Sequence, residues 1–488
     1  MYLIILAVLA IWLVYEFYWK RRNLPPGPIP LPLIGNLHTL IWENPGYTFG
    51  ARCKKNYNPV YTWWMGRSPF VTICDFDLMK ETFVKDGDSY TDKYYFKGLN
   101  DIFRGGNYGI IESTGDRWRD HRRFALHQMR DLGLGKMKME ERILLELDDL
   151  TQKLIENPKV EIQEEFQRVI ANVINQMLFG YRFIGDKREE MSRLITMLKD
   201  QEKNGSSVMF LLALSEWSRK LPFFRGYWNR FLKFRDDFFG FFEQQIEQHK
   251  KEFDYETEDS TDYVEAYLKE QKKREAEGDF ESFCDLQLKN TVLDLWSAGL
   301  STTTSTLNWG VAYLLNNPEV LSKMYGELDQ VIGSSRHVTM NDKPNLPYIS
   351  AVIMEMQRAL NLLVSNIPHA TTRDVEVAGY YLSKGTTVVA DIGVLMYDEK
   401  MFPEPEKFKP ERFLQDEKVK TFPEMMPFSL GKRACPGEGL AKMELFLVIA
   451  NLVNRFKLTS SSPPPLKKGF TTMQKPASAI ELEAQYRF

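Results

Sequence analysis

Residues 428–437, which read Phe-Ser-Leu-Gly-Lys-Arg-Ala-Cys-Pro-Gly, constrain this chain more than any other stretch. Cys435 lies there between Gly431 and Gly437, which permit a tight turn and a close approach to a flat ligand. The apolar residues 439–453 follow and are predicted to be a helix, whose positive N-terminal end would favour the ionised sulfur. The stretch is therefore predicted to aim one thiolate at a metal. A buried structural cysteine in a glycine turn is the alternative.

The spacing Phe-x-x-Gly-x-Arg-x-Cys-x-Gly resembles the haem-binding loop of the cytochrome P-450 superfamily, the haem-thiolate monooxygenases. A thiolate is the axial iron ligand in such enzymes. The resemblance implies a mainly α fold with small β-sheets (α+β), with the haem between a long central helix and the cysteine loop. It also implies haem, an iron protoporphyrin, as the cofactor and Cys435 as the ligand of its metal.

Charge and cysteine content exclude several other classes. The 488 residues carry a formal net charge of −3 without a long basic tract, so nucleic acid is not expected as a partner. The four cysteines are Cys53, Cys74, Cys284 and Cys435, with no CxxC pair and no zinc spacing. A reducing compartment, where a free thiolate persists, is therefore expected.

The N-terminal residues 1–19 are apolar apart from Glu16, and a helix of that length spans about 28 Å, close to the thickness of a bilayer core. The basic residues 20–22 then place the rest of the chain on the cytosolic side. A cleaved signal peptide would instead begin with basic residues. We expect a transmembrane anchor at 1–19, a basic and proline-rich hinge at 20–32, and a body at 33–488. The resemblance implies a single pass through the endoplasmic reticulum membrane.

The body begins with strand-like runs and continues with helical ones. Residues 60–73 are predicted to be a hairpin. Residues 93–115 lack periodicity and are predicted to be a loop, which by resemblance lies over the haem and lines the substrate pocket. Residues 137–200 are predicted to be helical. The aromatic side chains between 208 and 242 form either a surface that dips into a membrane or core packing, and the sequence favours neither.

Trp118 and Arg122 are four residues apart and therefore share one helical face. An indole N–H beside a guanidinium makes a pair of donors for a carboxylate. An ordinary buried tryptophan in an amphipathic helix is the alternative. By resemblance these two residues bind a haem propionate.

Residues 281–316 are predicted to be one long helix that ends before Pro318. Gly299 near its middle removes a side chain where a flat cofactor could approach. The run that follows, Ser301 to Thr306, is rich in hydroxyl groups that compete for backbone hydrogen bonds. A bent helix without chemistry is the alternative. The run resembles the family pattern small-Gly-x-acid-Thr-Thr, in which Thr302 relays protons during oxygen activation.

The acid of that pattern is absent, because Ser301 occupies its place. A serine orients water but does not supply a proton as a carboxylate does. Asp294 lies almost two turns earlier in the chain and is not expected to replace it. We expect Thr302 and an ordered water to relay protons, assisted by Ser301. We also expect high uncoupling, in which much of the reductant is consumed without forming product.

Two further groups of residues are implied by the resemblance. Glu355 and Arg358, three apart on a helix, would join Arg412 in a buried cluster that braces the cysteine loop. His369 and Arg433 would bind the second propionate. Without the resemblance, the pair would be a surface salt bridge and His369 a surface residue. The sequence around His369 is most similar to the microsomal branch that acts on drugs, steroids and fatty acids.

The expected activity is insertion of one oxygen atom from dioxygen into a small hydrophobic substrate, namely a xenobiotic, steroid or fatty acid. The electrons would come from NADPH through a haemoprotein reductase, with a small electron-transfer cytochrome as a further candidate donor. A basic face for such an acidic donor is predicted from Arg119, Arg123, Arg130, Lys432 and Lys442, with scattered surface charge as the alternative.

Three alternatives remain at this point. The first, motivated by Ser301, is a haem-thiolate isomerase or dehydratase that needs no reductase. The second is a haem-binding sensor or carrier with a degenerate oxygen site. The third is a membrane protein without haem. Because the motifs from Trp118 to Gly437 follow the family's order, residues 33–488 are expected to form a single haem-thiolate catalytic domain.

Overall fold

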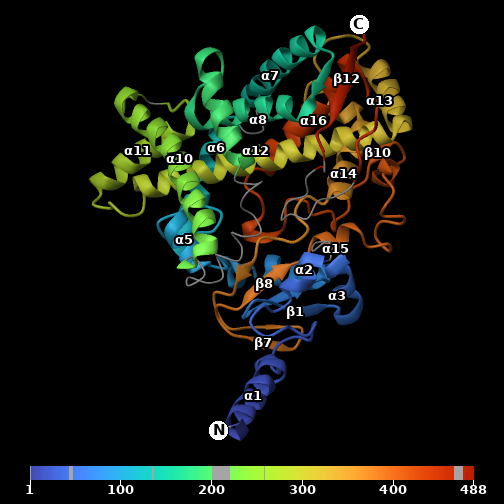
Figure 1. Ribbon diagram of the computed structural model, residues 1–488. Coiled ribbons are helices and arrows are strands. Elements are labelled where there is room, and N and C mark those ends of the chain that lie inside the picture. Colours follow the sequence, from blue (N-terminus) through green and yellow to red (C-terminus); the bar gives the residue numbers. More distant parts are fainter. Residues whose placement is uncertain are drawn as a thin grey trace.

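The computed structural model describes residues 2–42, 48–133, 137–200, 220–255, 257, 259–466, 476 and 478–488. Figure 1 shows a helical part and a smaller β-rich part, with α1 projecting from the β-rich end. The helices are α1 (Tyr2–Phe17), α2 (Leu37–Trp42), α3 (Gly50–Tyr57), α4 (Phe76–Met79), α5 (Lys97–Phe103), α6 (Gly115–Asp131), α7 (Met137–Glu156), α8 (Ile162–Phe179), α10 (Pro222–Glu252), α11 (Tyr263–Ala276), α12 (Asp285–Asn316), α13 (Pro318–Val331), α14 (Pro347–Leu360), α15 (Gly393–Met396) and α16 (Glu438–Arg455). The mainly α fold with small β-sheets is confirmed.

Helix α12 crosses the helical part and packs against α8, α10, α14 and α16 (Figure 1). Its side chains are buried along most of its length, as in a core helix. It begins at Asp285, slightly later than predicted. The side chain of Asp279 accepts hydrogen bonds from the backbone N–H groups of Glu281 and Ser282, and this turn precedes the helix.

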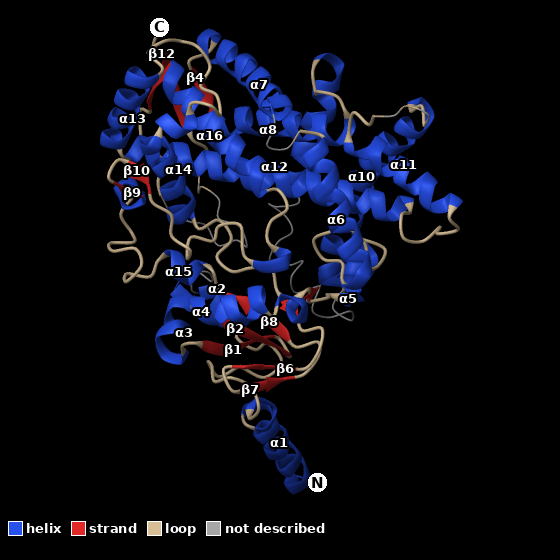
Figure 2. Ribbon diagram, turned by 180° about the vertical axis from the view of Figure 1, so that it is seen from behind, coloured by secondary structure: helices blue, strands red, loops and turns tan. Residues whose placement is uncertain are grey.

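The β-rich part is built on a sheet with strand order β1-β2-β8-β5-β3 (Figure 2). The predicted hairpin is confirmed as an antiparallel pair, β1 and β2. The chain returns through β8, which is parallel to β2, and the short strands β5 and β3 complete the edge. The strands are β1 (Val60–Met65), β2 (Ser68–Ile73), β3 (Asp92–Lys93), β4 (Lys159–Glu161), β5 (His369–Ala370), β6 (Val375–Val377), β7 (Tyr380–Leu382), β8 (Thr387–Ala390), β9 (Leu414–Gln415), β10 (Lys418–Val419), β11 (Phe456–Thr459) and β12 (Glu481–Tyr486).

Two sequence predictions about secondary structure are wrong in part. Residues 93–115 are not all loop, because they contain the end of β3 and helix α5. That helix is supported by packing on α10, where the ring of Phe103 stacks on that of Phe231 at 5.6 Å between centroids. Residues 137–200 include a strand, β4, which pairs with β12 near the far end of the chain.

The N-terminal helix fits the predicted anchor. The helical segment Tyr2–Arg21 has 20 residues, a mean hydropathy of 1.9 and only 6% of its hydrophobic window buried. The hinge after it is packed on β1: a Cβ at Gly27 would lie 1.9 Å from the carbonyl oxygen of Thr62. The ammonium group of Lys20 also lies 4.5 Å from the ring of Trp64. The hinge therefore fixes the direction in which α1 leaves the body.

The aromatic stretch 208–242 is described only from residue 220 onward. Phe238 and Phe242 are buried against Trp296 of α12, whereas Phe223 at the start of α10 is 76% exposed. The two interpretations of this stretch therefore apply to different parts of it: core packing holds for the second half of the described part, and an exposed apolar surface exists at the start of α10.

Candidate cofactor site

The cysteine loop runs from the end of the irregular segment after β10 to the start of α16. The backbone N–H of Cys435 donates to the carbonyl oxygen of Phe428 at 2.9 Å, which closes the loop. Gly431 has φ +73°, and a Cβ there would lie 2.0 Å from the carbonyl oxygen of Phe83. The positive φ confirms the predicted tight turn, and the missing side chain lets the backbone of Phe83 lie against this glycine. The predicted approach to a flat ligand stays a prediction.

Cys435 is accessible to solvent, but enough of the protein lies around its sulfur to affect the ionisation of the thiol. Burial raises the pKa of its thiol, while hydrogen bonds from the backbone N–H groups of Gly437 and Glu438 lower it, as does the charge of Arg122. The N-terminus of α16 therefore points at the sulfur, as predicted from the sequence. An exposed thiol that accepts hydrogen bonds from backbone donors is arranged to bind a metal.

Two of the predicted donors lie against this loop. Trp118 on α6 is 4% exposed, and its indole N–H has no hydrogen-bond partner among the described residues. The guanidinium of Arg433 lies 3.7 Å from the centroid of that indole. Arg122, one helical turn after Trp118, donates to the carbonyl oxygen of Ala434. The structure thus brings Trp118, Arg122 and Arg433 together beside Cys435.

Lys93 joins this cluster, although no pattern in the sequence had selected it. It is 6% exposed, and its ammonium donates to the carbonyl oxygen of Ile367 at 3.1 Å. Burial and the nearby charge of Arg433 lower the pKa of Lys93 well below its usual range. Its position follows from the pairing of β3 with β5, which sets it opposite His369. Only that long-range pairing could have revealed it.

His369 is 1% exposed and lies in the same cluster. Its Nδ1 is 2.6 Å from the carbonyl oxygen of Tyr90, which can only accept, so Nδ1 donates. Its Nε2 is 3.2 Å from the amide nitrogen of Asn366. Burial and the nearby charge of Lys93 lower the pKa of His369 well below its usual range. In the neutral ring Nε2 therefore accepts from the Asn366 amide, and it would donate to a propionate only if the ring were protonated and that amide turned aside, so the role of His369 stays a prediction.

The cluster has an excess of buried positive charge. Burial and the charge of Arg122 also lower the pKa of Arg433, which means that the two cations repel each other inside the protein. Buried cations and an unpartnered N–H call for an anion. A haem supplies two carboxylates for the donors and a metal for the sulfur, so the residues present fit this cofactor.

Helix α12 carries the two predicted proton-relay residues on adjoining faces. The hydroxyl of Thr302 donates to the carbonyl oxygen of Ala298 at 2.8 Å. Ser301 instead lines a hollow between α12 and α8. Thr303, the residue after Thr302, forms a side-chain hydrogen bond with Glu444 of α16, the helix that follows the cysteine loop. The interpretation of Gly299 as a site of cofactor approach is wrong, since a Cβ there would lie 2.7 Å from Cδ1 of Ile174 on α8.

Asp294 is engaged elsewhere, which agrees with the expectation that it does not replace the missing acid. One carboxylate oxygen, Oδ1, lies 2.7 Å from Nη2 of Arg104. The other accepts hydrogen bonds from the backbone N–H groups of Ile110 and Ile111 at 2.8 and 3.0 Å. Asp294 therefore ties the segment after α5 to α12.

The predicted cluster of Glu355, Arg358 and Arg412 is present. The Nε and Nη2 atoms of Arg358 donate to the two carboxylate oxygens of Glu355 at 2.8 and 2.9 Å, with both side chains fully buried. Nε of Arg412 lies 3.1 Å from Oε2 of Glu355. Arg358 also donates to the carbonyl oxygen of Met396 at 2.9 Å. The cluster fixes the segment that leads into the cysteine loop.

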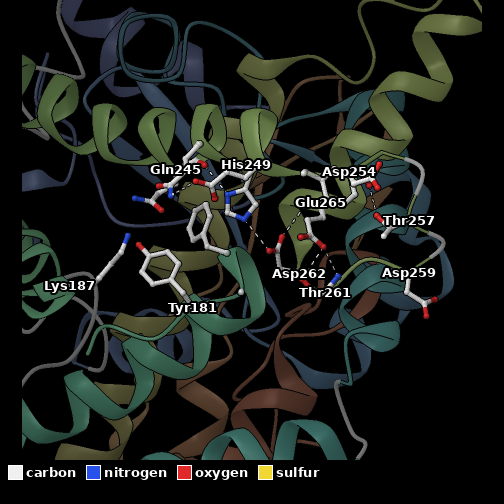
Figure 3. A pocket seen from close by; sticks show the side chains of 15 residues that line it. Tyr181, Lys187, Gln245, His249, Asp254, Thr257, Asp259, Thr261, Asp262 and Glu265 are labelled. Carbon is white, nitrogen blue, oxygen red and sulfur yellow. Dashed lines mark hydrogen bonds and ion pairs between the residues drawn. The ribbon is translucent and has the colours of Figure 1, made fainter. Parts of the chain in front are cut away.

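A separate hollow of about 500 Å³ lies among α8, α10 and the start of α11 (Figure 3). Figure 3 shows His249 facing Asp262, and their Nε2 and Oδ2 atoms are 3.0 Å apart. The residues that line the hollow include several carboxylates. None of the residues that line it belongs to the cysteine loop or the cation cluster, so it is not the cofactor site.

A cysteine aimed by a helix N-terminus, beside buried donors for two carboxylates, defines a haem-thiolate protein. The family model described as Cytochrome P450 matches residues 25–481. The chain is 34% identical over 485 residues to cytochrome P450 2C23 of Rattus norvegicus, covering 96% of this chain and 95% of that protein. It is 34% identical over 463 residues to cytochrome P450 2E1 of Oryctolagus cuniculus, covering 94% and 91%. It is 34% identical over 448 residues to cytochrome P450 2H1 of Gallus gallus, covering 90% and 88%.

The chain therefore belongs to the cytochrome P450 family. Its cofactor is haem, and it is an oxidoreductase of the monooxygenase class.

Proposed function

We propose that this chain is a membrane-anchored monooxygenase that inserts one oxygen atom into a small hydrophobic substrate, a xenobiotic, steroid or fatty acid, with electrons from NADPH. The observation that carries the proposal is the cysteine at the start of α16, facing a cluster of buried cations without enough anions. When bound, the haem supplies the chemistry that activates dioxygen.

The chain's own residues hold the cofactor. Cys435 binds the metal through its sulfur. Trp118 and Arg122 donate to one propionate, and Arg433 donates to the other. His369 joins Arg433 when its ring is protonated and the Asn366 amide turns aside. Lys93 adds a further positive charge from β3. The guanidinium of Arg433 already spans four carbonyl oxygens, those of Thr91, Ile110, Ile111 and Ser113, and is thereby oriented before the cofactor binds.

Proton movement is assigned to α12. Thr302 and an ordered water relay protons, and Ser301 assists. Because Ser301 has no carboxyl group, the relay is slower than in a protein with an acid there, and a large share of the electrons is lost to reduced oxygen rather than to product. Replacement of Ser301 by glutamate should raise the share of NADPH electrons recovered in product.

The location proposed is the endoplasmic reticulum membrane, with a single pass through α1 and the catalytic body on the cytosolic side. Support comes from the apolar helix Tyr2–Arg21 and from the basic residues at its C-terminal end. The exposed Phe223 at the start of α10 offers an apolar surface through which a substrate could leave the lipid.

The proposed electron donor is an NADPH-dependent haemoprotein reductase, with a small electron-transfer cytochrome as a second donor. Lys442 lies against Phe428 of the cysteine loop, 5.6 Å from its ring centroid, and Lys432 lies within that loop. These two lysines and Arg119 pair with Glu438, Asp88 and Asp116. The face is therefore of mixed charge, so docking would exchange these internal ion pairs for contacts with an acidic partner. Reversal of both lysines should raise the apparent KM for reductase.

The serine in place of the acid also favours a second candidate, a haem-thiolate isomerase or dehydratase that acts on a peroxide-like substrate without reductase. The two functions are separated by one reconstitution. The full chain in vesicles, with reductase and NADPH, is incubated with fatty acids, steroids and xenobiotics, and products are read by mass spectrometry. Products that gain one oxygen atom only when NADPH is present support the monooxygenase. Conversion of a lipid peroxide without NADPH, and no NADPH-dependent product, would overturn it.

A further inference from the structure

The hollow beside His249 has the size of a small-molecule pocket. Its volume is about 500 Å³, and such pockets typically measure roughly 300–1,000 Å³. One wall is a single face of α10, because its residues 245, 248, 249 and 252 have the spacing of one helical face. The other walls come from the end of α8 and the start of α11 (Figure 3). The proposed monooxygenase function makes no use of this hollow.

The buried part of the hollow contains a neutral pair of side chains. Nδ1 of His249 is 2.8 Å from the carbonyl oxygen of Gln245, which can only accept, so Nδ1 donates. Nε2 of His249 is 3.0 Å from Oδ2 of Asp262, and one proton lies between these two atoms. Whichever of the two atoms holds that proton, the pair carries no net charge.

The rest of the lining carries more negative than positive charge. The whole lining contains five carboxylates but only one lysine and one histidine. The histidine, His249, is paired with Asp262. The ammonium of the lysine, Lys187, lies 3.7 Å from the carboxylate of Glu190, which does not line the hollow. The hollow therefore attracts cations.

Two of these carboxylates, Glu252 and Glu265, accept hydrogen bonds from neutral groups. Oε1 of Glu252 accepts from the amide of Gln248 at 3.0 Å. Oε2 of Glu265 accepts from the backbone N–H and the hydroxyl of Thr261 at 2.6 and 2.9 Å. Neither carboxylate forms an ion pair with a residue that the structure describes, so both are available to bind a cation.

Gln245 provides an independent indication of a ligand. It lines the hollow, is only 3% exposed and lies one helical turn before His249 (Figure 3). Its backbone carbonyl accepts from His249, whereas its side-chain amide forms no hydrogen bond with the described residues. A buried amide without a partner is costly. A ligand whose N–H group donates to Oε1 of Gln245 would satisfy it.

The lining favours an organic cation over a metal ion. In the described part of the chain, no group of three or more His, Cys, Asp or Glu side chains could hold a metal. The aromatic rings of Phe179, Tyr181 and Phe253 also line the hollow. The ammonium of Lys187 lies 4.3 Å from the ring centroid of Tyr181, and that of Lys269 lies 5.4 Å from the ring centroid of Phe253. Aromatic rings beside carboxylates are suitable surroundings for organic ammonium groups.

We propose that this hollow binds a small organic polyammonium ion, a methylene chain that carries two or more ammonium groups. The ammonium groups pair with Glu252 and Glu265, and one N–H donates to Oε1 of Gln245. The methylene groups lie against the aromatic rings. The bound ion joins the end of α10 to the start of α11, because Glu252 belongs to one helix and Glu265 to the other. No residue of this site belongs to the cofactor site, so the proposal does not depend on the proposed monooxygenase function.

Titration calorimetry of the haem-loaded full chain with spermine, at low ionic strength, tests the site. Wild type should bind one spermine per chain with saturable heat, and spermine should raise the midpoint of thermal unfolding. The double variant Glu252→Gln, Glu265→Gln keeps the hydrogen-bond acceptors and removes the charges, so its affinity should be roughly tenfold lower. The absence of saturable binding to wild type, or equal affinity in the double variant, would overturn the proposal.

Glu247→Gln is the matched control for charge. Glu247 is a carboxylate of α10 that pairs with Lys250 and does not line the hollow. Its variant should bind spermine with the affinity of wild type. An equal loss of affinity in Glu247→Gln and in the double variant would show attraction to the surface in general and would overturn the site.

Gln245→Leu tests the amide. The leucine has a similar volume and cannot accept a hydrogen bond. Its affinity for spermine should fall severalfold, whereas its unfolding midpoint without spermine should not fall, because the amide has no partner to lose. Wild-type affinity in Gln245→Leu would overturn the assignment of this amide to the ligand.

Two further titrations decide the class of ligand. Magnesium chloride at matched ionic strength should not displace spermine, and displacement would overturn the choice of an organic cation. An oligolysine peptide is the second probe. Binding of this peptide without binding of spermine would overturn the small-molecule assignment and indicate a basic protein partner.

Discussion

The guanidinium of Arg433 lies 3.7 Å from the centre of the Trp118 indole, and the indole N–H beside it has no partner in the described residues. Arg433 comes from the cysteine loop and Trp118 from α6, far apart in sequence. Their contact joins the residue beside the thiolate to the donor pair on α6. A buried N–H without an acceptor, next to a guanidinium, is a suitable donor for a bound anion.

Trp118→Phe keeps a ring for Arg433 and removes the N–H. A hydrogen bond to a charged group contributes about 1.5–3 kcal/mol, so haem should bind roughly 10- to 100-fold more weakly in the variant. The measurement is the rate of haem transfer to an acceptor apoprotein. Trp296→Phe is the control, since that indole N–H is also buried without a partner but belongs to the aromatic core around α10. Equal transfer rates in wild type and Trp118→Phe would refute the propionate role.

Glu355→Gln leaves the guanidinium groups of Arg358 and Arg412 buried without a counter-charge. Breaking a buried ion pair costs about 3–5 kcal/mol, so the free energy of unfolding in denaturant should fall by that order. Glu404→Gln, on an exposed carboxylate paired with Lys407, should leave the unfolding free energy unchanged. If both variants behave alike, Glu355 does not brace the fold.

Gly431→Ala should disrupt the cysteine loop. The alanine would need a left-handed backbone, which costs about 1–2 kcal/mol, and its Cβ would overlap the carbonyl oxygen of Phe83. Gly240→Ala in α10 meets nothing within 4 Å and should stabilise by about 1 kcal/mol. Gly431→Ala should therefore lower both the free energy of unfolding and the haem content. Gly240→Ala should raise the free energy of unfolding and leave the haem content unchanged. A Gly431→Ala chain with normal stability would contradict the loop geometry described.

The pH dependence of stability should carry the signature of Glu444. Burial raises its pKa to about 8, and the hydrogen bond with Thr303 offsets only part of this shift. In the unfolded chain the pKa of a glutamate is about 4.3, so the folded state binds the proton more tightly. The stabilising contribution is complete below about pH 4.3 and is lost as pH rises to about 8. Glu444→Gln should flatten the unfolding free energy between about pH 5 and 8; an unchanged slope would contradict the assignment.

Local patterns predicted the parts of the fold that depend on neighbouring residues. The hairpin at 60–73 is set by its runs of β-branched and aromatic residues. The long helix, α12, is set by its apolar positions and ends before Pro318. The clamp of Glu355, Arg358 and Arg412 and the pair Trp118 and Arg122 followed from spacing together with family resemblance. The hairpin, the long helix and the spacing of Trp118 and Arg122 need no knowledge of the distant chain, whereas the place of Arg412 in the clamp came from the resemblance alone.

The parts that were missed depend on distant contacts. Lys93 lies in the cation cluster only because β3 pairs with β5. Likewise, β4 is a strand only because it pairs with β12 near the far end of the chain. Gly299 and Gly431 were recognised as sites of close approach, but the sequence does not say what approaches: Ile174 in one case and the Phe83 backbone in the other. The hollow behind Ser301 likewise needs two helices to form.

The most direct test of the central claim is the carbon monoxide spectrum of the reduced protein, with Cys435→Ala compared with Cys284→Ala. Cys284 precedes α12 and lies outside the cofactor site, so its variant should keep the thiolate-type spectrum and full haem content. The account predicts that wild type and Cys284→Ala give this spectrum and that Cys435→Ala loses it. A thiolate-type spectrum that persists in Cys435→Ala would contradict the account.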